Sequence, residues 1–333
     1  MLEGSVQQSG EKLRVTAQLV DAVDGKHLWS ERYDRKLDDL FALQDEITNK
    51  IFEAMQVELV VDVGKVKTRL KYAGSPENYR IFMQVRALWL SITVADHKEG
   101  ERLLTELYNK DPENALVIQW LGWYQFQKLL LRLTKDPKET MALAREYGEK
   151  GRIGDGTALL LLAWLDLFAR DYDSAIENAG RAAELSPSSG MTNAVAADHH
   201  MMAGQPEKAS VLFKHAMRLH PHYDEWVPVR LAFSLVAQEK YDEAQELFTA
   251  VITSGKSVRQ PVQSLEGMAV IAVFKGEMEK ARAYIAQLLE LNPQFSITAT
   301  KGRNGFMKDQ ELLKRYLDAL RQAGLPEKGK QQS

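Results

Sequence analysis

Hydrophobic and polar positions follow the same order in two consecutive stretches of the chain, residues 157–187 and 191–221. Each has an apolar run, a short polar turn, a second run with apolar residues three or four positions apart, and a closing proline. That spacing indicates an amphipathic helix, and proline ends a helix. Each stretch therefore predicts a helix–turn–helix unit. Small residues and prolines of the first stretch return 34 residues later: Ala175, Ala182 and Pro187 as Ala209, Ala216 and Pro221.

Less regular copies of the pattern occupy residues 76–112, 115–151, 226–255 and 263–293. Turn residues interrupt it too often for a coiled coil. The period resembles that of tetratricopeptide repeats, whose helical hairpins stack into a solenoid. We therefore predict a mainly α fold, a tetratricopeptide-type α-solenoid of about six helix–turn–helix repeats. The predicted segments are repeats over 61–294, a C-terminal capping helix within 295–326 and a disordered tail, 327–333.

Residues 1–60 show a different pattern. Leu13, Val15, Ala17 and Leu19 alternate with polar residues, which is the period of a half-buried strand. Ser9-Gly10 and Asp24-Gly25 are hairpin turn signals. We predict a small antiparallel β-meander with strands at 3–8, 12–22 and 27–33. An amphipathic helix over 37–59 should then cover the sheet or lead into the repeats. Because three such strands rarely fold alone, the chain is expected to be part of something longer.

Composition narrows the function. Hydrophobic residues make up 45% and charged residues 27%, as in folded proteins that do not cross membranes. The apolar run 158–168 is far below the roughly 20 residues that span a bilayer. A net charge of −3 gives no reason to expect nucleic acid as a partner. The chain has no cysteine, so disulfides and thiolate chemistry are excluded. No signal peptide is recognised, and cytoplasmic and periplasmic locations both stay open.

Segments at both ends resemble a known bacterial architecture. They read LEGSV (2–6), LRVTAQLVD (13–21), HLWSERYDR (27–35) and LQDEI (43–47), then FMKD (306–309), LLKRYL (312–317) and LRQAGLP (320–326). They are similar to the end of the TolB-like α/β domain and to the C-terminus of multidomain adenylate/guanylate cyclase-like proteins. The resemblance implies that 1–60 is the last part of a TolB-like domain. It also implies that any catalytic or DNA-binding domain would precede this chain, so no catalytic residue is carried over.

Candidate chemistry inside the chain is weak. His199, His200, His215, His220 and His222 cluster in sequence, but neighbours on a helix point about 100° apart, and we expect no metal and no cofactor. The glycine-containing segments 151–156 and 301–305 lack the order that cradles phosphate, and both are interpreted as turns between helices. No nucleophile–base arrangement is present, and we predict that the chain is not an enzyme.

The sharper hypothesis concerns a groove. In this class of fold, the first helix of each repeat lines the concave face, and its positions 2, 5, 9 and 12 point inward. Aromatic and methionine side chains there favour a peptide or an amphipathic helix. The alternative is that the tryptophans pack between repeats, or against the N-terminal helix folded back into the groove. Besides Ala194, the predicted groove residues are Gln119, Trp123, Phe126, Leu160, Trp164, Asp198, Met201 and Phe233.

The sequence thus predicts a non-catalytic scaffold that binds a protein or peptide, as the sensory or regulatory tail of a signalling protein. Two alternatives stay open. The segment could regulate a nucleotide cyclase on the same polypeptide, or the edge of the meander could pair with a second copy and make a homodimer.

Overall fold

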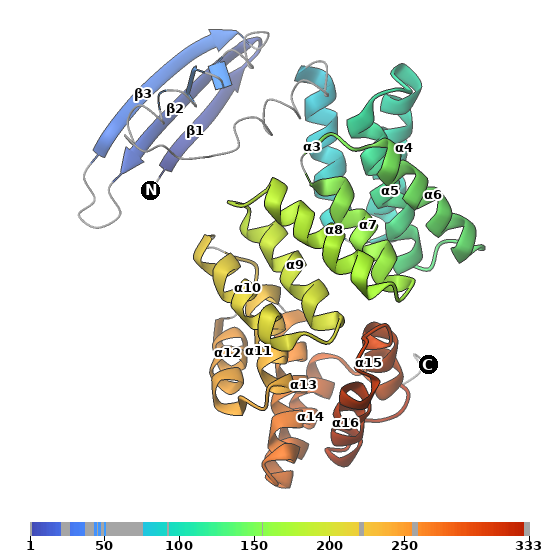
Figure 1. Ribbon diagram of the computed structural model, residues 1–333. Coiled ribbons are helices and arrows are strands. Elements are labelled where there is room, and N and C mark those ends of the chain that lie inside the picture. Colours follow the sequence, from blue (N-terminus) through green and yellow to red (C-terminus); the bar gives the residue numbers. More distant parts are fainter. Residues whose placement is uncertain are drawn as a thin grey trace. The chain divides into compact units, whose positions relative to one another are not determined.

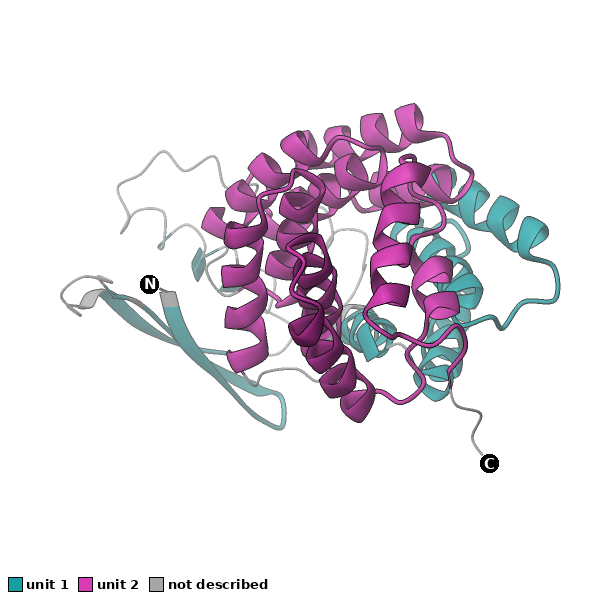
Figure 2. Ribbon diagram, turned by 90° about the horizontal axis from the view of Figure 1, so that it is seen from below, with its two compact units in different colours: residues 1–155 teal, residues 156–333 magenta. Residues whose placement is uncertain are grey.

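The computed structural model describes residues 2–20, 27–36, 43–44, 46–47, 50, 76–91, 93–154, 156–219, 223–254 and 259–329. The chain divides into two compact units, residues 1–155 and 156–333, which Figure 2 draws in teal and magenta. The described elements are three strands and 14 helices, labelled in Figure 1. The predicted class, an α-solenoid with a small β-meander, is confirmed.

The first unit begins with the meander. Strands β1 (Leu2–Ser9), β2 (Lys12–Val20) and β3 (His27–Lys36) pair antiparallel in the order β1-β2-β3. The predicted turn at Ser9-Gly10 is present, and Gly10 adopts φ 61°, which suits glycine. The turn at Asp24-Gly25 lies outside the described residues. Leu13 and Tyr33 are buried together with Leu43, from the predicted helix 37–59. Apart from a few residues around Leu43, that helix also lies outside the described part.

Two helical hairpins follow in the first unit. They are α3 (Pro76–Ser91) with α4 (Val94–Lys110), and α5 (Ala115–Leu130) with α6 (Pro137–Lys150). Gly100 stands in α4 where other repeats carry alanine. A Cβ there would lie 1.8 Å from the Tyr124 hydroxyl, which donates a hydrogen bond of 2.8 Å to the Val85 carbonyl. Glycine is required because the tyrosine crosses α4 at this point.

The second unit holds four more hairpins and a C-terminal pair. The hairpins are α7 (Thr157–Phe168) with α8 (Tyr172–Leu185), α9 (Gly190–Met202) with α10 (Pro206–Leu219), α11 (Trp226–Ala237) with α12 (Tyr241–Ser254), and α13 (Arg259–Phe274) with α14 (Met278–Leu291). They coincide with the predicted repeats. The repeated alanines, which let paired helices approach closely, are fully or almost fully buried: Ala175, Ala182, Ala209 and Ala216.

The C-terminal pair of helices departs from the prediction in its first helix. Helix α15 (Ile297–Asn304) includes most of the segment 301–305, so the interpretation of that segment as a turn is wrong. Ser296 caps this helix by accepting a hydrogen bond from the Ala299 amide, and a serine before a helix is an N-cap signal that the sequence carries despite the glycines. Helix α16 (Gln310–Gln322), with Asp309 as its N-cap, lies where the capping helix is predicted, and its role as a cap stays a prediction.

Candidate binding surface

The predicted groove residues of the first unit lie on α5, and all of them are buried. Gln119 is fully buried, and Trp123 and Phe126 keep 7% and 3% of their surface. The Trp123 ring packs edge-on against Trp89 of α3, with the ring centres 5.3 Å apart, and against Phe126 at 6.0 Å. The Trp89 indole N–H donates to the Trp123 carbonyl. These contacts join α3 to α5, and a role of the three residues in binding stays a prediction.

The predicted residues of the second unit are less uniform. Asp198 and Met201 are buried, whereas Leu160, Trp164 and Phe233 are half-buried. They belong to the first helices of three consecutive hairpins. Helices α7, α9, α11 and α13 lie side by side, each in contact with the next. We call these four first helices the first-helix wall.

Single charged residues interrupt the apolar sequences of the wall, and they are paired. The Asp198 carboxylate of α9 accepts a hydrogen bond of 2.5 Å from the Arg230 side chain of α11. On α13, Glu266 is completely buried and accepts from the Thr300 hydroxyl at 2.9 Å and from the Arg303 guanidinium at 2.6 Å. Burial raises the pKa of Glu266, and the charge of Arg303 opposes that rise.

Thr300 and Arg303 belong to the C-terminal residues 297–325, which we call the return segment because it runs back over the wall (Figure 1). It touches every one of the four first helices. Its contacts on them are Phe306 stacked on Phe168 of α7, the Lys308 amide bonded to the Met202 carbonyl of α9, Tyr316 edge-on to Phe233 of α11, and Arg303 paired with Glu266 of α13.

Two turns between paired helices also bond to the return segment. Arg170 donates to the Gly305 carbonyl at 2.9 Å, and Glu239 pairs with Arg315 at 3.2 Å. Both turn residues adopt a positive φ, 63° for Arg170 and 59° for Glu239. The hairpin between them has Gly204 at the same place, with a φ of 77°. A side chain in this conformation costs about 1–2 kcal/mol, so it persists only where neighbouring contacts hold it. The geometry of the hairpin holds it, since Arg132 in the turn after α5 has a φ of 56° as well.

His199 and His200 form hydrogen bonds within the protein. His199 is fully buried; its Nδ1 bonds the Val195 carbonyl at 2.8 Å, and its ring packs against Trp164 at 4.7 Å. The Nδ1 of His200 bonds the Gln205 side chain. Burial lowers the pKa of both histidines. His220 and His222 lie outside the described residues, and within the described ones no three histidine or acidic side chains gather as a metal site would require.

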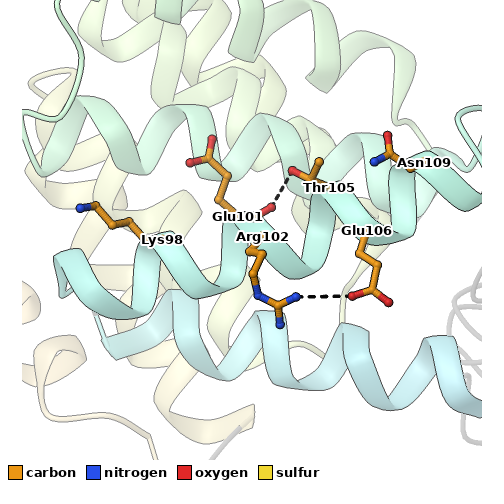
Figure 3. A pocket seen from close by; sticks show the side chains of 6 residues that line it. All are labelled: Lys98, Glu101, Arg102, Thr105, Glu106 and Asn109. Carbon is orange, nitrogen blue, oxygen red and sulfur yellow. Dashed lines mark hydrogen bonds and ion pairs between the residues drawn. The ribbon is translucent and has the colours of Figure 1, made fainter.

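One surface depression lies along α4 in the first unit (Figure 3). It has a volume of about 590 Å³, and its described lining residues are Lys98, Glu101, Arg102, Thr105, Glu106 and Asn109. All come from one helix, and none is apolar. Arg102 pairs with Glu99 and Glu106, and Lys128 pairs with Glu101. Charges that neutralise each other on an open helix face are typical of solvated surface, not of a ligand pocket.

Sequence reasoning missed Arg230, which pairs with Asp198 inside the wall, and Glu266, which pairs with Arg303 of the return segment. Arg230 and Glu266 are isolated charges in otherwise apolar helices, as is Asp198. A charge at such a position is buried and needs a partner, which is a signal that the sequence does carry. The partners themselves, such as Arg303, lie more than 30 residues away and were not predictable from spacing.

Fold and repeats together define a tetratricopeptide-type α-solenoid, and residues 262–295 match the family model described as tetratricopeptide repeat. Solenoids of this class bind protein or peptide partners on their curved surface. Among the described residues, no helix is long and apolar enough to span a bilayer.

A curated relative matches part of this chain. A Rhizobium meliloti (strain 1021) protein named "Putative adenylate cyclase 3" is 37% identical over 116 residues, which are 34% of this chain and 19% of that protein. The chain thus matches about a fifth of the length of this curated relative.

One of the similar solved structures supports the fold. The APC/C hetero-tetramer Cut9-Hcn1 superposes with a TM-score of 0.53 and 15% identity, over 72% of this chain and 44% of that one. YrrB, described as a tetratricopeptide protein with an unusual peptide-binding site, gives a TM-score of 0.41 and 16% identity over 57% and 92% of the two chains.

Proposed function

We propose that the chain is a non-catalytic scaffold that binds a protein or peptide and forms a sensory or regulatory part of a signalling protein. The carrying observation is the stack of helical hairpins, whose first helices form a continuous wall with half-buried aromatic side chains. Such a surface suits an extended or helical polypeptide better than a small molecule, since it offers area and few convergent polar groups.

The test compares partner binding with folding. Trp164 is half-buried on α7, and its replacement by alanine should weaken capture of the partner from extracts of the source organism. Circular dichroism should stay unchanged, because truncation of a half-buried residue leaves the repeats stacked. The control is Leu185→Ala, an exposed apolar residue on α8. Loss of helicity in the Trp164 variant would assign this residue to the core instead.

A second candidate function is regulation of a nucleotide cyclase on the same polypeptide. It is favoured by the identity of 37% to the protein with a cyclase name. The coding sequence upstream of residue 1 tests it directly. A cyclase domain in frame would support this function, and a stop codon followed by a ribosome-binding site would refute it. The isolated chain should produce no cyclic nucleotide from ATP and Mg²⁺.

Self-association is a third candidate. Among the described strands β1 lies at the edge of the sheet, and Val6 on it is 68% exposed. Unpaired edges of this kind pair readily with another strand. Light scattering should then report a dimer that dissociates when residues 1–35 are deleted. A monomer at micromolar concentration would exclude this candidate.

A further inference from the structure

The return segment makes more contacts than an end cap requires. A cap on a solenoid covers the last hairpin, here α13–α14. Residues 303–316 instead contact all four hairpins of the second unit, back to Phe168, Arg170 and Tyr172. The sequence separation of the contacts with the first hairpin exceeds 130 residues. A polypeptide ligand bound along a repeat surface would likewise contact several consecutive hairpins.

The chemistry of these contacts also resembles ligand recognition. Two aromatic side chains, Phe306 and Tyr316, meet aromatic partners on the wall at 5.1 Å and 6.0 Å. Two arginines, Arg303 and Arg315, meet the acidic Glu266 and Glu239. Arg315 also lies over the ring of Phe274 at 5.6 Å. Aromatic and arginine anchors are the residues that dominate binding at protein interfaces.

The net charge of the return segment differs from that of the whole chain. The return segment carries six basic and three acidic side chains, whereas the chain as a whole has a net charge of −3. Its basic anchors face acidic side chains of the wall and of the turn after α11. Helix α16 is strongly amphipathic, with Leu313, Leu317 and Leu320 buried on one side.

We propose that the first-helix wall is a groove for a basic amphipathic helix, and that residues 297–325 are its resident intramolecular occupant. This rests on the proposed function, because it names the regulation of the same surface. An outside partner of the same chemistry, with arginines and an aromatic residue on one helix face, gains access when the return segment leaves the wall.

Release should be local, because the contact of the segment with the turn after α11 is near the surface. Arg315 and Glu239 keep 57% and 64% of their side-chain surface, so water reaches this ion pair without opening the hairpins. In native-state hydrogen exchange, the amides of residues 297–322 should therefore exchange before those of α9–α12. Exchange of both sets in a single step would overturn the proposal, since the segment would then be an integral cap.

The binding test uses the full chain and a fluorescent peptide of residues 295–327. In the wild type the tethered segment occupies the wall, so the peptide binds weakly. The variant Phe306→Ala/Arg315→Ala weakens only the tethered copy and should raise the apparent affinity at least about tenfold. The matched control is Lys314→Ala, which removes the same charge from an exposed position of α16 and should behave as the wild type. Equal affinities, absence of binding to the variant, or loss of its helicity would each overturn the proposal.

A reversible lock sharpens this test. The nearest side-chain atom to a Cβ built on Gly204 is the Lys308 Cβ, at 3.9 Å, which is within the range that a disulfide bridges. The chain has no other cysteine to interfere. Gly204→Cys/Lys308→Cys, added to the weakened variant, should abolish peptide binding when oxidised and restore it when reduced. Binding unaffected by the lock would place the peptide elsewhere. Because the assay needs no outside partner, its result is independent of whether the partner of the proposed function is found.

Discussion

At the scale of residues, Gly100 leaves space in the hairpin α3–α4 for the side chain of Tyr124. Alanine is usual at this point of the second helix, and Ala175, Ala209, Ala244 and Ala281 are buried in other hairpins. In the hairpin α3–α4 the Tyr124 hydroxyl occupies that space instead, and its hydrogen bond to the Val85 carbonyl ties α5 to α3.

Gly100→Ala should therefore destabilise the protein by about 1–3 kcal/mol, since the added methyl group must displace the buried Tyr124. Gly180→Ala on α8 is the matched control. A Cβ there meets nothing within 4 Å, so the protein should gain roughly 0.5–1 kcal/mol from the better helix propensity of alanine. Denaturant unfolding measures both, and a stabilising Gly100→Ala would show that Tyr124 moves freely.

The pair Glu266–Arg303 allows a second prediction at this scale. Arg303→Met leaves the carboxylate of Glu266 buried beside Thr300 without its cation. The cost should be roughly 3 kcal/mol at neutral pH, the low end for a broken buried pair because Arg303 is one-third exposed. Glu266→Gln in the same chain should recover most of it, since no uncompensated charge is left.

The pH dependence of the Arg303→Met effect checks its cause. The folded-state pKa of Glu266 is already raised by burial, and removal of Arg303 raises it further. Protonation then favours the folded state, so stability is lost as the pH rises from the unfolded-state pKa through the folded one. The variant should be less impaired at about pH 5 than at about pH 8. An equal cost at both values would point to lost packing of the arginine stem.

At the scale of elements, most helix boundaries follow from local signals. Asp171, Ser189 and Asp309 each accept a hydrogen bond from a backbone amide of the first helical turn. Gly204 takes the left-handed conformation before α10 begins at Pro206, as is usual for glycine after a helix and for proline in a first turn. Arg170 and Glu239 adopt the same conformation without being glycine, which shows that the hairpin geometry imposes it.

The cap of α16 offers the prediction at this scale. Asp309 accepts from the Leu312 amide at 2.8 Å, so Asp309→Ala should cost about 0.5–2 kcal/mol. Because the cap belongs to the return segment, the loss should appear first as faster hydrogen exchange of residues 310–322. Asp309→Asn, which keeps the acceptor, should restore protection. Unchanged exchange in the alanine variant would mean that packing alone holds the helix.

At the scale of the whole molecule, the buried His199 and the half-buried His200 should make unfolding sensitive to pH. Burial lowers the pKa of His199 and His200 below the ordinary value of 6.5. The unfolded chain therefore binds protons first as the pH falls, and stability present above about pH 7 is lost below it. Asp198 and the Val195 carbonyl oppose this shift at His199, and Lys208 strengthens it at His200.

The size of the effect follows from linkage. Between about pH 7.5 and 5.5, one histidine that stays neutral when folded contributes a loss of up to about 1.4 kcal/mol. His199→Asn, whose amide can replace the bond to Val195, should flatten the curve by that amount. His215→Asn, on α10, controls for removal of a histidine elsewhere. Parallel curves for the wild type and the His199 variant would show that His199 charges in the folded state.

Prediction of the site was less complete than prediction of the fold. Phe233 was proposed from its helix position and does contact the return segment, through Tyr316. Trp123 was proposed from the same rule and packs between α3 and α5. Periodicity assigns a residue to one side of a helix, but both a groove and a neighbouring helix can lie on that side. The binding role of all nine predicted residues stays a prediction.

The sequence by itself determined the repeating hairpins, the meander, the helix near the C-terminus and the absence of cysteine chemistry. These depend on local physics: the periods of helix and strand, the backbone limits of proline and glycine, and the first-turn amides that Asp and Ser side chains cap. Only the tertiary structure decided what the first-helix wall contacts. The pairing of Glu266 with Arg303, and of Phe168 with Phe306, depends on the accumulated twist of four stacked hairpins. Small rotations at each interface add up along the solenoid, and no single local pattern encodes where the chain returns.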